Sequence, residues 1–313
     1  MQKRKNIRLI IILSVLVSSS IIISFLSTDK EGSPYSGKFN IGDINSVSEL
    51  EFVGDNIENK LSLKSNVWAI NNRYQADNQL VEVLLNVLSR ISVRRPVAKK
   101  DVEAVLDEFN KNGITLKIQS ENGIQEWEIT ASEDGKTFFK ENMGIPYEMN
   151  IPGYGSQVGS LFFLTENQWR NKVLFSSNFR TIKKLSLENF LFPDRSFEIV
   201  DSGGFLEVSG INRLDTASLI RYIENLNYFD ADGYLDKGEY ERFDSLETYS
   251  KPIFRLEISD IDTTFNNQIL VYPRIKGDRY YFGITKDGQR FVLEENKGLS
   301  LSPDIDFFHA ESE

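Results

Sequence analysis

The chain has 313 residues, of which 40% are hydrophobic and 12% aromatic, so it can form packed domains and is not a disordered protein. Its formal net charge is −10. The first 28 residues contain four of the 36 Lys and Arg and none of the 46 Asp and Glu, which leaves the remainder at −14. That charge excludes nucleic acid as a partner. The absence of cysteine excludes disulfides, thiolate nucleophiles and cysteine-based metal sites.

Residues 1–28 predict a basic cytoplasmic flank followed by a transmembrane anchor. Residues 9–26 contain only Leu, Ile, Val, Phe and Ser, and a helix needs about 20 apolar residues to cross a bilayer. Four cations precede this segment: Lys3, Arg4, Lys5 and Arg8. Because a positive flank stays cytoplasmic, we expect a single-pass protein of the inner (cytoplasmic) membrane, with its C-terminal part extracytoplasmic, or periplasmic.

Two other interpretations of this segment stay open. A cleaved signal peptide would use residues 9–17 as its apolar region and Ser18 to Ser20 as its cleavage region. Against this, the apolar segment resumes at Ile21 and there is no Ala-x-Ala pattern. The remaining alternative is a buried helix of a soluble domain.

The pattern after a short polar tether, residues 29–38, predicts a first α+β unit over residues 39–151. Strands are expected at 48–53, 60–64, 67–71, 114–119, 125–131 and 136–140. Apolar residues at helical spacing predict a helix over 77–91, capped by Asp77, and another over 101–112, ended by Gly113. The expected fold class is α+β, with twisted antiparallel sheets and a few covering helices.

Comparison of the chain with itself at an offset of 138 residues predicts an internal duplication. Trp68, Ile70 and the capping Asp77 match Leu206, Val208 and Asp215, and the helix after each Asp has apolar residues at the same places. A third stretch, 254–284, repeats only the strand part. Gly and Pro in 151–156 favour a boundary there, so the second α+β unit, with its strand-rich C-terminal block, is expected over 152–313.

A cluster of five cations is the candidate docking patch for an acidic partner or for the membrane surface. It consists of Arg90, Arg94, Arg95, Lys99 and Lys100. Such a cluster is unusual in so acidic a chain. The alternative interpretation is a solvated junction between two helices.

The sequence contains few groups that point to catalysis, a metal or a cofactor, and we expect none of the three. His309, the single histidine, lies near an acidic terminus and is expected to be a solvated tail residue. Residues 228–239 imitate a calcium loop but have Tyr228 where the first carboxylate belongs. Trp68, Trp127 and Trp169 fit core positions better than a sugar-stacking surface.

The chain resembles the bacterial proteins grouped as domain of unknown function 4340. The resemblance rests on residues 66–77 (NVWAINNRYQAD), the helix that follows to Ile91, and Arg95-Pro96-Val97; residues 196–216 fit the second half. These motifs are structural. The resemblance implies a single-span envelope protein, often encoded beside ATP-binding-cassette transporters related to gliding motility, and no catalytic residues.

These observations predict a membrane-anchored extracytoplasmic accessory or scaffold protein, not an enzyme. Its expected partners are the bilayer, through residues 9–26, and proteins of an envelope complex such as a transporter or a gliding-related assembly, contacted through sheet edges or the cationic cluster. The alternatives are a carbohydrate- or lipid-binding module with exposed aromatic residues and, with less support, a carboxylate-dependent hydrolase.

Overall fold

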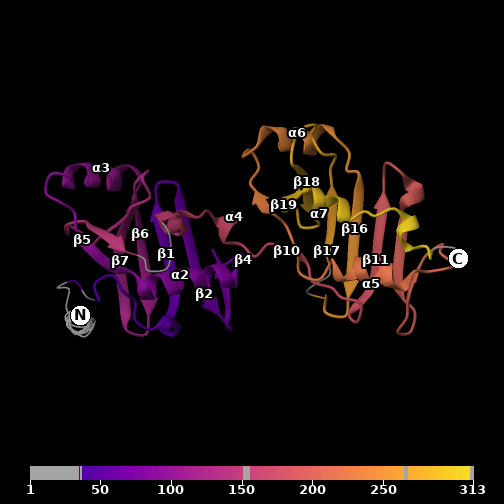
Figure 1. Ribbon diagram of the computed structural model, residues 1–313, viewed down its shortest axis with the longest axis horizontal. Helices are drawn as coiled ribbons and strands as arrows, with labels where there is room; N and C mark the ends of the chain where they lie inside the picture. Colours follow the sequence, from indigo (N-terminus) through magenta and orange to yellow (C-terminus); the bar gives the residue numbers. More distant parts are fainter. Residues whose placement is uncertain (1–34, 36, 151–155, 264–266, 311–313) are drawn as a thin grey trace, which may run out of the picture. The chain divides into compact units, whose positions relative to one another are not determined.

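The computed structural model describes residues 35, 37–150, 156–263 and 267–310. The chain divides into two compact units, Met1–Thr165 (unit 1) and Glu166–Glu313 (unit 2), each built on one large antiparallel sheet (Figure 1). The boundary expected at residue 152 lies outside the described residues. The predicted anchor, 1–28, also lies outside them, and no described helix has the length and apolar composition needed to cross a bilayer.

Unit 1 contains a nine-stranded sheet in the order β4-β3-β2-β1-β6-β7-β8-β9-β5. Its strands are β1 (Val47–Gly54), β2 (Ile57–Lys64), β3 (Val67–Ile70), β4 (Tyr74–Gln75), β5 (Ser92–Pro96), β6 (Ile114–Ser120), β7 (Gly123–Ala131), β8 (Thr137–Lys140) and β9 (Tyr147–Asn150). The helices of the unit are α2 (Asn78–Arg90), α3 (Val102–Asn112) and the 3-10 helices η1 (Ile44–Ser46) and η2 (Ser156–Phe163).

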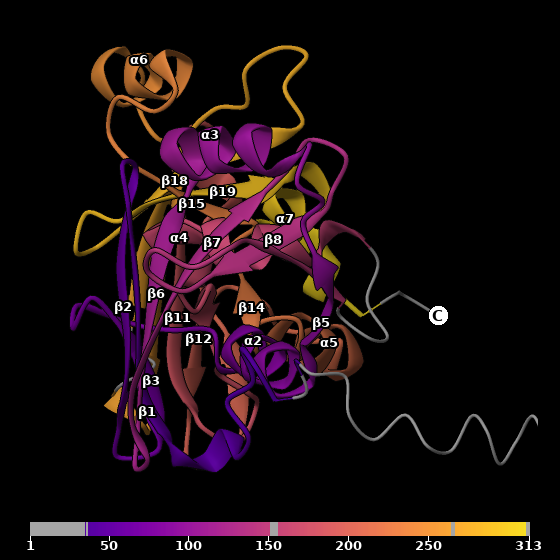
Figure 2. The same cartoon turned by 90° about the vertical axis from the view of Figure 1, so that its left-hand side faces the viewer.

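One face of the unit 1 sheet carries the core. Leu50 and Phe52 on β1 are buried, as is Leu116 on β6, whereas the alternate residue Glu49 forms an ion pair with Lys60 across the strands at 2.7 Å. Helix α2 begins because Asp77 accepts hydrogen bonds from the amides of the first turn. Figure 2 shows the strands changing direction from β2 and β3 to β7 and β8, with α2 inside the curve.

Unit 2 contains an eight-stranded sheet in the order β13-β12-β11-β16-β17-β18-β19-β15, and a separate pair, β10-β14. Its strands are β10 (Val173–Phe175), β11 (Ile182–Asn189), β12 (Phe197–Asp201), β13 (Leu206–Val208), β14 (Phe229–Asp230), β15 (Gly233–Leu235), β16 (Phe254–Asp260), β17 (Asn267–Val271), β18 (Tyr280–Thr285) and β19 (Arg290–Glu294). The helices are α4 (Glu166–Trp169), α5 (Thr216–Glu224), α6 (Glu241–Tyr249), α7 (Glu295–Ser300), and the 3-10 helices η3 (Pro193–Arg195) and η5 (Ile305–Phe308).

The two sheets have the same strand order when their elements are matched in chain order. The series β3-β2-β1-β6-β7-β8-β9-β5 corresponds strand for strand to β13-β12-β11-β16-β17-β18-β19-β15, and every pairing is antiparallel. In chain order, helices α2 and α5 follow the third matched strand (β3 and β13), and α3 and α6 precede the fifth (β6 and β16). The stretch 254–284 is therefore the second half of the unit 2 sheet, and the interpretation of it as a third partial repeat is wrong.

The last described segment of the chain completes the core of unit 2. Phe308 at the end of η5 is fully buried between Phe197 and Tyr222, with ring centroids 5.0 and 5.5 Å away. His309 has an exposed side chain, but its backbone forms a β-bridge with Leu214. His309 thus belongs to the folded unit, and its expected place in a solvated tail is wrong for the backbone.

Candidate functional site

An open cleft of about 510 Å³ lies in unit 1 between α3 and the end of the sheet formed by β8, β9 and β5. Its floor includes Phe138 on β8, Glu148 on β9 and Arg95 on β5, which are paired in register across the three strands. Directly paired residues of antiparallel strands point to the same face of the sheet, so these three side chains share the face that α3 covers. We call this site the α3 cleft.

A β-bulge gives the cleft two adjacent arginines at one carboxylate. The register of β5 and β9 moves from Val93 opposite Met149 to Arg95 opposite Glu148, which leaves Arg94 as the extra residue. Both arginines therefore reach Glu148, with Arg94 Nη1 at 2.7 Å and Arg95 Nε at 2.8 Å from its two oxygens. The Glu148 side chain is only 5% exposed, whereas the arginines are 62% and 64% exposed. The buried carboxylate holds two solvent-facing guanidinium groups in place.

The rim of the cleft adds Lys100 from the loop before α3, and Lys136 and Asp134 from the turn between β7 and β8. Hydrogen bonds from Lys136 and from the Ser132 hydroxyl lower the pKa of Asp134 to about 2. Asp134 is therefore ionised and paired with Lys136 at neutral pH. Lys100 is exposed.

The structure brings together three of the five residues of the predicted docking patch. Arg94 and Arg95 meet at Glu148, and Arg95 and Lys100 line the same cleft. Arg90, at the end of α2, and Lys99 are exposed and do not line it. The interpretation of this segment as a solvated helix–helix junction is wrong, because Ser92–Pro96 forms β5, an edge strand of the sheet.

Sequence reasoning missed Glu148 and Lys136, which join the cationic cluster only through the fold. Glu148 is 53 residues from Arg95 in the chain. The available signal was a single acidic residue between Tyr147 and Met149, which are both buried. A lone charge between buried residues indicates a partner, but it does not say which one.

In unit 2 helix α6 covers the matched place. There Val292 lies opposite Phe282, as Glu148 lies opposite Phe138 in unit 1. Phe243 of α6 stacks on Phe282 at 5.5 Å, and Tyr272 packs on the same ring at 5.4 Å. The matched face is thus covered by α6 in unit 2, whereas in unit 1 it is accessible.

An ion-pair cluster also fixes α6 to its sheet. Arg290 on β19, whose side chain is 7% exposed, contacts Asp244 at 2.5 Å and Glu247 at 3.1 Å, both on α6. The guanidinium also lies 5.0 Å from the centre of the Phe282 ring. Each of the two helices buries one side chain: Phe243 in α6, and Phe109 in α3, which lies beside the ammonium of Lys140.

The segment that imitates a calcium loop is used for strand pairing. Asp230 belongs to β14, and β15 follows directly at Gly233–Leu235. Lys297 forms ion pairs with Asp230 at 2.9 Å and Asp232 at 3.2 Å. In the described part of the chain no group of three or more His, Cys, Asp or Glu side chains could hold a metal ion. Two of the four carboxylates of this segment, those of Asp230 and Asp232, thus have a cation of the protein itself as their partner.

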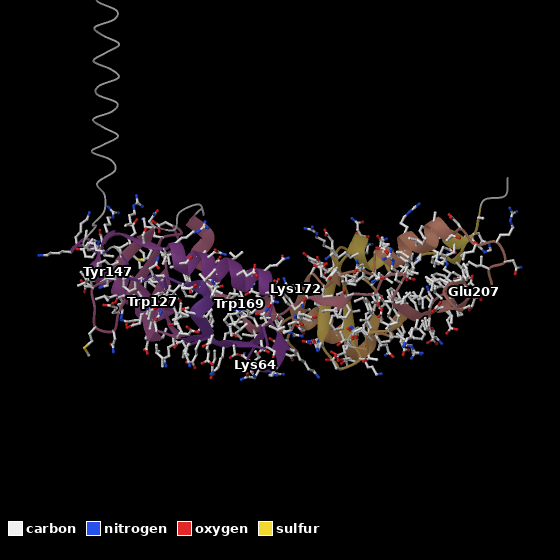
Figure 3. The ribbon with its side chains drawn as sticks, turned by 90° about the horizontal axis from the view of Figure 1, so that it is seen from below. Lys64, Trp127, Tyr147, Trp169, Lys172 and Glu207 are labelled. Carbon is white, nitrogen blue, oxygen red and sulfur yellow. The ribbon has the colours of Figure 1, made fainter. Side chains whose placement is uncertain are left out.

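The three tryptophans are core residues, which confirms that prediction. Trp68 is 7% exposed, Trp127 is 5% exposed and Trp169 is fully buried. Figure 3 labels Trp127 and Trp169 among the side chains of their units. None of the three offers a free ring face for stacking on a sugar.

Comparisons with protein-family models, with curated proteins and with solved structures find no match to this chain.

Proposed function

We propose that this chain is a membrane-anchored extracytoplasmic accessory protein that binds a protein partner through the β5 edge of unit 1. The observation that carries the proposal is the α3 cleft beside an edge strand with two fixed, solvent-facing arginines. The apolar segment 9–26 supports the membrane location. The resemblance to domain of unknown function 4340 supports a place beside a transporter or gliding-related complex.

The edge strand itself favours a protein partner. Among the described residues β5 pairs only with β9, so its other edge has unpaired backbone groups. Free edges are templates for strand addition by another chain. The bulge at Arg94 and the proline at Pro96 discourage non-specific pairing, so an incoming segment has to match a short, charged edge.

We further propose that the two units arose by internal duplication. The matched strand order supports it, and so do the two caps: Asp77 and Asp215 each accept hydrogen bonds from the amides two and three residues ahead. In this proposal unit 1 has the binding cleft, and the corresponding place in unit 2 is covered by α6.

The alternatives from the sequence have less support. A sugar-binding surface has less support because the three tryptophans that could stack on a sugar are buried. A carboxylate-dependent hydrolase needs one acid that gives up a proton and another that stays ionised. Of the four carboxylates that line the cleft, Glu148 is bound by two arginines and Asp134 by Lys136, and Glu108 accepts a hydrogen bond from Asn112.

The test is crosslinking of the full-length protein in intact cells, followed by detergent extraction, affinity capture and mass spectrometry. The Lys99→Glu/Lys100→Glu variant should lose the captured envelope protein, because it reverses two exposed charges beside β5. The matched control Lys183→Glu/Lys237→Glu reverses two exposed lysines of unit 2 and should retain it. Equal capture by both variants, or no partner at all, would overturn the proposal.

A further inference from the structure

We infer that the α3 cleft receives a carboxylate from an extended, acidic segment of the partner protein. The inference rests on the proposed function and adds the chemistry of what is bound. It follows from the donors that Arg95 and Lys100 present, from the pairing of the acids around them, and from the edge strand beside the cleft.

Arg95 presents an unused pair of donors. Its Nε donates to Glu148 at 2.8 Å, and among the described residues its Nη1 and Nη2 groups have no hydrogen-bond partner. A guanidinium can bind two carboxylates on two different edges, and a pair of terminal N–H groups fits both oxygens of a carboxylate. Because Glu148 already holds the side chain, Arg95 loses little conformational freedom when a ligand binds.

Lys100 supplies an unpaired cation in the same cleft. It is exposed and has no ion pair within the part of the chain that the structure describes. Of the acidic side chains of the cleft, Glu148 and Asp134 already have cationic partners. The other two acids of the lining are Asp101, at the start of α3, and Glu108 on α3, whose carboxylate accepts a hydrogen bond from Asn112 at 2.6 Å. We therefore expect the bound carboxylate at the β5 side of the cleft, where Arg95 presents its terminal N–H groups.

The edge strand explains why the ligand should be extended. Side chains alternate along a strand, so in a segment paired with β5 every second side chain points to the face that carries the cleft. Pro96 has no N–H group and ends the usable edge. The bound segment is thus short, with acidic residues at alternate positions.

The experiment uses the full-length protein in detergent micelles and two fluorescent octapeptides, one that alternates Thr with Glu and one that alternates Thr with Gln. Fluorescence anisotropy should show binding of the Thr-Glu peptide, at least about tenfold weaker binding of the Thr-Gln peptide, and a loss of affinity with added salt. Equal binding of the two peptides would overturn the inference, because the carboxylates would then not matter.

Two variants locate the bound carboxylate. Lys100→Gln and Arg95→Lys should each weaken binding of the Thr-Glu peptide by about tenfold, and Arg95→Lys keeps a cation for Glu148. The control Lys183→Gln changes an exposed lysine of unit 2 and should bind like the wild type. Circular dichroism of each variant verifies that the fold is intact. Unchanged binding by both cleft variants would place the peptide elsewhere and overturn the inference.

The failures of the two proposals are distinguishable. If Lys99 and Lys100 are needed for capture in cells but the Thr-Glu peptide does not bind, the protein docks a partner by other chemistry and this inference is wrong. If the peptide binds as described but cells yield no partner, the cleft still recognises carboxylates and the accessory role is wrong.

Discussion

Glu148 and Val292 occupy the same position in two sheets of the same strand order. Each lies on the strand next to the edge of its sheet, β9 or β19, directly opposite a phenylalanine of the preceding strand, β8 or β18. A valine needs no charged partner, whereas a buried carboxylate requires cations. This difference accompanies the change from a face covered by α6 in unit 2 to an open cleft under α3 in unit 1.

Removal of the two arginines that bind Glu148 should destabilise the protein more than removal of both arginines together with Glu148. In Arg94→Met/Arg95→Met the buried carboxylate loses both partners, and we expect the free energy of unfolding to fall by about 3 kcal/mol. In the triple variant that adds Glu148→Val, most of this loss should be recovered, because no buried charge remains. Urea-induced unfolding of the wild type and of the two variants measures both differences in the free energy of unfolding.

The matched control is the exposed pair Lys184 and Glu198, whose side chains are 50% and 37% exposed. Replacement of both by Gln should change the free energy of unfolding by less than about 1 kcal/mol. A triple variant at the cleft that is no more stable than the double variant would show that Glu148 is not what makes the arginines necessary.

Asp215 should make the stability of unit 2 depend on pH. Hydrogen bonds from the Ser218 hydroxyl and from the backbone amides of Ser218 and Ala217 lower its pKa. Its stabilising effect is present above the pKa of an unfolded Asp, about 3.9, and is lost as the pH falls through the lower pKa of the folded state. The difference in unfolding free energy between the wild type and Asp215→Asn should therefore shrink from about pH 6 to about pH 2. A constant difference would contradict the role of the ionised cap.

Arg290 should hold α6 in place. Replacement by Met removes the cation between Asp244 and Glu247 and should lower the free energy of unfolding by about 2 kcal/mol. Amide hydrogen exchange in α6 should accelerate, since the helix loses its tie to β19. The control is Arg279→Met, which breaks an ion pair with Glu294 whose arginine is 70% exposed; it should leave exchange in α6 unchanged.

Calcium should not bind to residues 228–239. Lys297 already forms ion pairs with Asp230 and Asp232, and Tyr228 cannot supply the first carboxylate of the loop. Calorimetric titration of the full-length protein with calcium is expected to give no saturable heat. A site with a dissociation constant in the low micromolar range would contradict this use of the segment.

Local sequence patterns were sufficient for the elements of unit 1 with clear periodicity. The helix expected over 77–91 is α2, Asn78–Arg90, with Asp77 as its cap, and the helix expected over 101–112 is α3, Val102–Asn112. Both have an apolar stripe, the first begins after the capping Asp77 and the second ends at Gly113, so neighbouring residues alone define them. The expected α+β class with antiparallel sheets is confirmed.

Elements that depend on distant partners were not predictable. Strand β5 contains two consecutive arginines at a β-bulge. The bulge interrupts the alternation of side chains on which a strand prediction rests, so β5 was not predicted. Strand β15 is three residues long and forms through β19. The cleft combines β5 with Glu148 and Lys136, which no local pattern connects to it. The residue types predicted a cationic surface. The cleft depends on the pairing of β5, β9 and β8, which the sequence pattern did not predict.

The burial of Phe308 sets an order in which the two units can form. Unit 1 is complete once Thr165 has been synthesised, whereas the core of unit 2 lacks a ring between Phe197 and Tyr222 until residue 308 is available. Domains fold as units, with the N-terminal one first during synthesis. The α3 cleft can therefore exist on a nascent chain whose second unit is still open, so the partner binding that we propose can begin before translation of unit 2 has finished.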